Sequence, residues 1–197
     1  MLIGVLALQG AVSEHSGALD SLNISNKEVR NTDDIREVDG LIMPGGESTT
    51  LRKLLVNSNL WDFIKESDIP IMGTCAGAIL LGKSDDITFE KMDYVIDRNF
   101  YGRQIDSFEE KLEIRGYPEF RGVFIRAPAI TDIGKTQAIA YCKGNVVGCI
   151  EGKNMALTFH PELTGNPYFH KMWIDTLEWN AININNYAKN SVVSIMN

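Results

Sequence analysis

One short segment, Met72-Gly73-Thr74-Cys75-Ala76-Gly77-Ala78 (residues 72–78), carries most of the information about how this chain folds. It combines the end of an apolar strand, a central cysteine and the start of a helix. A sharp turn from strand to helix lifts its central side chain above the sheet and crowds the neighbouring residues. Gly73, Ala76 and Gly77 are small enough to relieve that crowding. The segment therefore predicts a strand-to-helix elbow with Cys75 at its tip.

Short apolar strands alternate with helices on both sides of this elbow in the first half of the chain. Strands are expected at Leu2–Leu8, Gly40–Met43 and Ile69–Gly73, and helices at about 11–22, from residue 48 through 55 and from 76 to 81. Ser13 and Ser48 are the expected N-cap residues of the first two helices. This alternation indicates a parallel sheet that is covered by helices on both faces.

The pattern changes after about residue 90, where short strands are separated by turns. Strands are expected at Tyr94–Ile96, Val123–Ile125, Ala138–Tyr141, Val146–Ile150 and Ala156–Phe159. Gly144-Asn145 is typical of a hairpin turn. A final helix is expected at about Pro167–Trp179, and the Asn-rich tail after about residue 180 is expected to be less ordered. Residues 1–197 are thus predicted to form one α/β domain with a small antiparallel extension.

Composition excludes several classes of protein. The chain has 197 residues, 44% hydrophobic residues and a net charge of −7. A diffuse negative charge argues against a nucleic-acid surface, which needs clustered Lys and Arg. No apolar run is long enough to span a membrane. Three cysteines without a Cys-x-x-Cys pair argue against a disulfide framework or a zinc site and favour a reducing, cytoplasmic setting.

Cys75 is the strongest candidate for a nucleophile. It would lie at the carboxyl end of a parallel strand, where open α/β sheets place their sites. It would also lie at the N-terminus of a helix, where the dipole favours thiolate over thiol. Taken alone, the segment leaves a buried structural cysteine equally open. For Cys142 and Cys149, which lack such a setting, the structural interpretation is favoured.

A cysteine nucleophile needs a base, and the chain contains three histidines. His15 and His170 lie in predicted helices, at positions typical of solvated or half-buried residues. His160 instead follows a strand and precedes Pro161-Glu162. Residues i and i+2 of an extended segment project to the same side, so Glu162 could orient the imidazole of His160. The alternative is an ordinary turn after a strand, which the Cys75 elbow makes the weaker interpretation.

The segment Pro44-Gly45-Gly46-Glu47-Ser48 joins a predicted strand to a helix. Glycines allow backbone N–H groups to approach a ligand closely, and such groups stabilise an oxyanion in acyl transfer. The N–H groups of Gly46 and Ala76 are the expected donors. The alternative is a simple turn, because a Pro-Gly-Gly sequence alone is a weak signal. The segment is not a P-loop, because it lacks the Gly-Lys-Ser/Thr ending.

Together and in this order, these elements resemble the class I (triad) glutamine amidotransferases, and more narrowly the glutaminase subunits of pyridoxal 5′-phosphate synthase. The resemblance covers nearly the whole chain. The broad class is marked by Cys-x-Gly at 75–77 and by His160-Pro161-Glu162. The narrower family is indicated by Gly102-Arg103-Gln104 and by Phe124-Ile125-Arg126-Ala127-Pro128.

The resemblance implies a three-layer, flavodoxin-like fold with a mostly parallel central sheet. It implies that Cys75 is the nucleophile, His160 the base and Glu162 the residue that orients it. It also implies a glutamine pocket lined by Gly46, Glu47, Ser48, Arg103, Ile125 and Arg126. A planar guanidinium suits the α-carboxylate of glutamine. Without the resemblance, both arginines would be interpreted as surface or structural residues.

The implied activity is hydrolysis of L-glutamine to L-glutamate and ammonia, with no metal and no cofactor. The ammonia would pass to a (β/α)₈-barrel synthase subunit that makes pyridoxal 5′-phosphate, in a large hetero-oligomer. Three alternatives are weaker. The glutaminase subunit of another pathway does not fit the two narrow motifs. A non-catalytic regulatory subunit does not need the intact Cys75, His160 and Glu162 set. A free-standing peptidase-like hydrolase or deglycase typically lacks His-Pro-Glu at this place.

Overall fold

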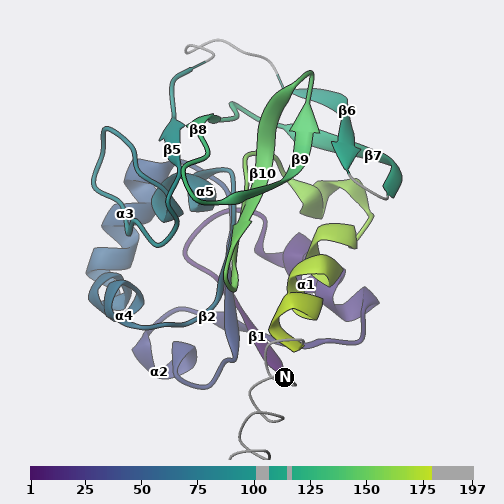
Figure 1. Ribbon diagram of the computed structural model, residues 1–197. Helices are drawn as coiled ribbons and strands as arrows, with labels where there is room; N and C mark the ends of the chain where they lie inside the picture. The colour runs from purple at the N-terminus through teal and green to yellow at the C-terminus, as the bar shows by residue number, and fades with distance from the viewer. Residues whose placement is uncertain (101–106, 115–116, 179–197) are drawn as a thin grey trace, which may run out of the picture.

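A computed structural model describes residues 1–100, 107–114 and 117–178, and its centre is a nine-stranded sheet (Figure 1). Five neighbouring strands run parallel, in the order β2 (Ser25–Val29), β1 (Leu2–Leu6), β3 (Gly40–Met43), β4 (Ile71–Thr74) and β11 (Asn154–Leu157). The order 2-1-3-4 followed by one more parallel strand is that of flavodoxin-like sheets. The predicted fold class is therefore confirmed.

The remaining four strands extend this sheet in antiparallel fashion. They follow β11 in the order β10 (Asn145–Glu151), β9 (Gln137–Cys142), β6 (Phe108–Ile114) and β7 (Tyr117–Phe124). A separate pair, β5 (Val95–Asp97) and β8 (Ala129–Asp132), forms a small antiparallel sheet. The hairpin between β9 and β10 turns at Lys143 and Gly144, which both have positive φ, so the turn lies one residue earlier than predicted.

Helices cover both faces of the sheet (Figure 1). One face packs against α3 (Ser48–Asn57), α4 (Leu60–Glu66) and α5 (Ala76–Leu81), and the other packs against α1 (Val12–Ser21) and the helix at 168–178. Side chains of β3 alternate between these two cores, because Leu41 and Met43 enter the first and Ile42 enters the second. Among the described residues, no helix has both the length and the apolar character needed to cross a membrane.

Both predicted N-caps are wrong. The N-cap of α1 is Ala11, which makes no side-chain cap, and Ser13 lies inside the helix. The N-cap of α3 is Glu47, whose extended backbone lets its carboxylate accept hydrogen bonds from the N–H groups of Thr49 and Thr50. A charged acceptor in this position satisfies two free N–H groups and complements the helix dipole, so it replaces Ser48 as the cap.

Two strands were not predicted because their sequences lack an apolar pattern. β2 is an edge strand with only Val29 buried, and β6 is a charged strand with exposed residues along most of its length. The short helix α2 (Thr32–Ile35) and α4 were also missed. The final helix is seen over 168–178, and the predicted tail after residue 180 lies outside the described residues.

The helix that follows Cys75 packs directly on the sheet at two glycines. A Cβ on Gly77 would lie 2.1 Å from the carbonyl oxygen of Met43 in β3. A Cβ on Gly73 would lie 2.7 Å from the backbone of Gly77. Backbone atoms cannot yield as a flexible side chain can, so these glycines allow the elbow to form. Their role is the one that the sequence predicted.

We expect Gly77→Ala to lower the free energy of unfolding by about 1–3 kcal/mol, because the added methyl overpacks a rigid backbone contact. The matched control is Gly17→Ala, in the exposed face of α1, where a Cβ would meet nothing within 4 Å. Alanine loses less backbone entropy than glycine when the chain folds, so that variant should be about 0.5–1 kcal/mol more stable than wild type. Urea denaturation of both variants measures the difference, and equal stability would contradict the packing argument.

Candidate active site

Cys75 is the N-cap of α5 and has an unusual backbone conformation, with φ 49° and ψ −104°. Such a conformation costs about 1–3 kcal/mol in a non-glycine residue and persists only where the surroundings fix it. Here the N–H of Cys75 donates to the carbonyl of Leu157 in β11 at 2.8 Å, and its own carbonyl accepts from the N–H of Ile79 at 3.1 Å. The elbow is therefore held from the sheet and from the helix at once.

His160 and Glu162 follow β11, the strand next to the elbow. The N–H of His160 donates to the carbonyl of Val123 at 2.8 Å, which fixes the backbone. His160 Nδ1 lies 2.7 Å from Glu162 Oε1, and both side chains are buried. Because a carboxylate can only accept, Nδ1 carries the proton and Nε2 faces Cys75.

The contact between these residues was predicted, but for a different reason. Glu162 does not lie in an extended segment, since Pro161–Thr164 form the 3₁₀ helix η1. The tight turn of η1, begun by Pro161, brings the carboxylate back to the ring of the residue just before it.

Cys75 and His160 meet at Gly45, in the loop after β3. A Cβ on Gly45 would lie 2.4 Å from His160 Cε1 and 3.1 Å from Cys75 Cβ, so both side chains pack against this glycine. Burial alone lowers the pKa of His160, but hydrogen bonds with Cys75 and Glu162, together with their charges, raise it to about 10. The geometry therefore places a His160 ring with a raised pKa between the side chains of Cys75 and Glu162.

The loop that contains Gly46 is held from the first strand of the sheet. Gly46 has φ 132°, and a Cβ there would lie 2.6 Å from Gln9 Nε2. The amide of Gln9 donates to the carbonyl of Glu47 at 3.0 Å. Ala76 is the first residue of α5, so its N–H has no acceptor within the helix. Ala76 directly follows Cys75, and Gly46 directly follows Gly45, which packs against Cys75, but the role of both N–H groups stays a prediction.

The residues predicted for the glutamine pocket come from the loop after β3, the start of α3 and the segment after β7, and one of them lies outside the described residues. The carbonyl oxygen of Ile125 lies 3.8 Å from Cys75 Sγ. Arg126 is exposed, and its backbone φ is 46°. Ser48 is buried at the start of α3. Arg103 falls within 101–106, which the structure does not describe.

Glu47 caps the N-terminus of α3, a role that the sequence did not predict. Hydrogen bonds, foremost from the Thr50 hydroxyl, lower the pKa of Glu47 to about 2 and keep it charged. Arg98 lies beside this cap, with Nη1 3.0 Å from Thr49 Oγ1 and Nη2 3.8 Å from Glu47 Oε1. Nothing local in the sequence distinguishes Arg98 from the other arginines, because its partners come from the start of α3 and from Asp86 in the loop after α5.

The interpretation of His15 and His170 as solvated or half-buried residues is wrong. Both are fully buried, and His15 Nδ1 lies 2.9 Å from His170 Nε2. His15 Nε2 lies 3.5 Å from Glu162 Oε2. His15 and His170 are therefore linked to His160 through the carboxylate of Glu162. Only a tertiary contact could show this, since His15 is far in sequence from the other three residues.

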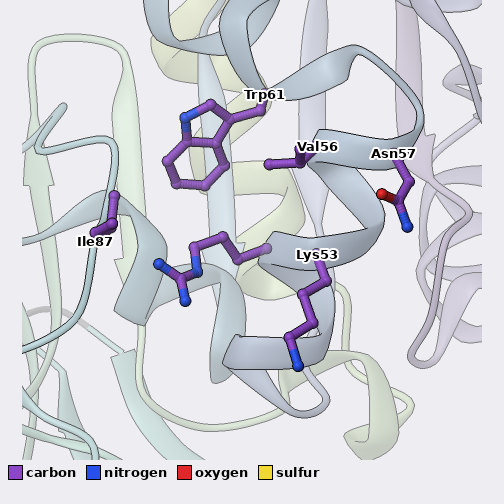
Figure 2. A pocket seen from close by; sticks show the side chains of 6 residues that line it. Lys53, Val56, Asn57, Trp61 and Ile87 are labelled. Atoms are coloured by element: carbon purple, nitrogen blue, oxygen red, sulfur yellow. The ribbon is translucent and has the colours of Figure 1, made fainter.

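Another surface groove, on α3 and α4, lacks this chemistry (Figure 2). Figure 2 shows Lys53, Val56 and Trp61 around it, with Ile87 facing them from the loop after α5. No cysteine or histidine lines it. The other two cysteines are buried, and burial raises the pKa of both thiols, that of Cys149 to about 12. Among the described residues, Cys75 is thus the cysteine that packs beside a histidine.

Comparison with known proteins places this geometry in context. The model of the SNO glutamine amidotransferase family matches residues 5–179. A pyridoxal 5′-phosphate synthase subunit PdxT from Methanocaldococcus jannaschii is 45% identical over 173 residues, which cover 85% of this chain and 93% of that protein. PdxT from Streptococcus pneumoniae is 43% identical over 189 residues, which cover 89% of this chain and 96% of that protein.

Solved structures agree with the fold. A crystal structure described as a glutamine amidotransferase is 39% identical, covers 89% of this chain and 98% of its own, and superposes with a TM-score of 0.82. Another glutamine amidotransferase, from Thermotoga maritima, has a TM-score of 0.58 at 17% identity and covers 92% of this chain and 85% of its own. At that identity the second likeness concerns the fold alone.

The three histidines should titrate at widely separated pH values, although all would titrate near 6.5 in an unfolded chain. His160 should lose its proton only near pH 10, because its pKa is raised. His170, whose pKa burial lowers to about 4, should stay neutral down to that pH, and His15, whose pKa burial also lowers well below its usual value, should likewise be neutral at pH 6.5. NMR of the ring signals measures all three, with Glu162→Gln as the control that should lower the value for His160. Three titrations clustered near 6.5 would contradict the site geometry.

Proposed function

Because the chain belongs to the SNO glutamine amidotransferase family, we propose that it hydrolyses the side-chain amide of L-glutamine and is the glutaminase subunit of a pyridoxal 5′-phosphate synthase. The observation that carries this proposal is the grouping of Cys75, His160 and Glu162, in which Cys75 and His160 pack against the same glycine and His160 Nδ1 lies 2.7 Å from Glu162 Oε1. A nucleophile, a base and a residue that orients the base are the parts that acyl transfer requires.

The first step forms a thioester. The Cys75 thiolate attacks the side-chain carbonyl carbon of glutamine, and the carbonyl oxygen becomes an oxyanion beside the N–H groups of Gly46 and Ala76. When the tetrahedral intermediate collapses, the carbon–nitrogen bond breaks. His160 gives its Nε2 proton to the leaving nitrogen, which departs as ammonia. The products of this step are a γ-glutamyl thioester on Cys75 and a neutral His160.

The second step depends on a change in the environment of His160. Acylation removes the thiolate, and with it one of the groups that raise the pKa of His160, while burial still lowers that pKa. Neutral His160 can then accept a proton from a water molecule as the oxygen attacks the thioester. The carbon–sulfur bond breaks, glutamate leaves, and the thiolate and imidazolium are restored. One water is consumed for each glutamine.

Charged side chains near Cys75 would bind the charged groups of glutamine. Arg126 is exposed beside Ile125, and within the described residues its guanidinium makes no ion pair. A guanidinium without a protein carboxylate is suited to the α-carboxylate of glutamine. Arg103 is the second candidate from the sequence. The alternative of a glutaminase for another pathway is not favoured, because the similar proteins cited above are PdxT subunits.

The partner is a synthase subunit, since the relatives are named as subunits of pyridoxal 5′-phosphate synthase. We infer that it is the (β/α)₈-barrel subunit of that enzyme, in a large hetero-oligomer. Ammonia released into water is protonated and loses its nucleophilicity, so direct transfer between subunits preserves it. Docking of the partner would also complete the oxyanion loop at Gly46, which is exposed in the isolated chain.

The test is release of glutamate from glutamine, with and without the barrel subunit, for wild type and Cys75→Ala. Wild type should be stimulated by the partner, and Cys75→Ala should lose at least about 10³-fold in kcat. Cys142→Ala serves as the matched control and should keep its activity, because Cys142 lies buried in β9, outside the site formed by Cys75, His160 and Glu162. Activity that survives Cys75→Ala would refute the nucleophile, and an inactive complex with the partner bound would refute the glutaminase.

A further inference from the structure

Glu162 presents two carboxylate oxygens, and only one of them is used by His160. Oε1 accepts from His160 Nδ1 at 2.7 Å. Oε2 is buried and has no hydrogen-bond partner of ordinary geometry among the described residues. The atom that faces it is Nε2 of His15, at 3.5 Å. A buried carboxylate oxygen without a donor is costly, so this approach calls for an explanation.

His15 lies in a closed pocket between three elements. It comes from α1, and its Nδ1 is 2.9 Å from Nε2 of His170, which belongs to the helix at 168–178. Its Nε2 is also 3.4 Å from Thr74 Oγ1, at the end of β4. Both imidazoles are fully buried. The titratable groups that face His15 are therefore His170, His160 and Glu162.

The positions of the unsatisfied atoms decide which nitrogens carry protons. If His15 Nδ1 were protonated, it would donate to His170, and a bare Nε2 lone pair would face the Glu162 carboxylate. His170 Nδ1–H would then be a buried donor with no partner. If both rings are protonated at Nε2, His170 donates to His15, and His15 donates towards Glu162. The acceptor His170 Nδ1 is then left without a partner, and this arrangement costs less free energy than the first one.

We propose that His15 is a positioning residue for Glu162: a neutral imidazole whose Nε2–H holds Oε2, with its tautomer set by His170. This inference rests on the proposed function. His170 then donates to His15, and His15 donates to Oε2 of Glu162. On the other side of the carboxylate, His160 donates to Oε1. The carboxylate is fixed at both oxygens, so its orientation towards His160 does not depend on a single contact.

The neutrality of His15 matters for the chemistry. A cation in its place would neutralise Glu162 and weaken the support that the carboxylate gives to the His160 imidazolium. Burial, followed by the charges of His170 and His160, lowers the pKa of His15 well below its usual value. His15 therefore supplies a donor without adding a charge, as residues that orient an active-site ligand commonly do.

The test compares two polar substitutions of similar size. In His15→Gln, the side-chain amide nitrogen reaches the place of Nε2 and can still donate to Glu162. In His15→Asn, the shorter amide takes the place of Nδ1 and meets His170 but not Glu162. We expect His15→Asn to lose about 10- to 100-fold in kcat with KM little changed, and His15→Gln to recover most of that loss. The assay uses the complex with the barrel subunit.

Two further measurements separate positioning from a general structural role. The pH at which His160 loses its proton should fall in His15→Asn and stay unchanged in His15→Gln. It should also stay unchanged in Thr88→Val, which removes another buried hydrogen bond, from Thr88 Oγ1 to Gly82, away from the triad. In wild type, nitrogen NMR should show His15 and His170 protonated at Nε2, a result that does not depend on any variant folding.

The proposal is overturned if the kcat of His15→Asn equals that of Thr88→Val, or if His15→Gln and His15→Asn lose the same activity. It is also overturned if His15 is protonated at Nδ1 in wild type. The proposed function is tested separately in the same assay by Cys75→Ala. If that variant stays active, the glutaminase mechanism fails. If it is inactive while His15→Asn is fully active, only the role of His15 fails.

Discussion

The whole arrangement depends on the absence of Cβ atoms at a few points around Cys75. Gly73 and Gly77 let α5 approach the sheet, and Gly45 lets Cys75 and His160 come together against the β3 loop. The strained backbone of Cys75 is tolerated because β11 and α5 hold it by hydrogen bonds. A methyl group at any of these glycines would separate elements that the chemistry needs in contact.

A second constraint is electrostatic, and it acts through His160. Burial disfavours the imidazolium, while Cys75 and Glu162 favour it. The balance changes when Cys75 is acylated, so one histidine serves first as an acid and then as a base. Glu162 must keep its charge and its orientation through both steps. The buried pair His15 and His170 lies where it can provide the orientation without cancelling the charge.

Much of the fold and of the site could be predicted because the signals are local. The elbow at Cys75, the loop at Gly45 and the pair of His160 with Glu162 each lie within a few consecutive residues. The contacts of His15 and His170 could not be predicted, since they join the two helices on one face of the sheet only after folding. The cap of α3 was missed because Glu47 outcompetes Ser48 through its charge. Edge strand β2 was missed because an exposed strand has no apolar pattern.

The central claim is that Cys75 attacks the side chain of glutamine, and covalent trapping tests it most directly. A glutamine analogue with a chloromethyl ketone in place of the amide would lose chloride to the attacking sulfur and leave a stable thioether. With the barrel subunit bound, peptide mapping should find one adduct, on Cys75, and excess L-glutamine should prevent it. An adduct on Cys142 or Cys149, or labelling of Cys75 that glutamine does not slow, would contradict the account.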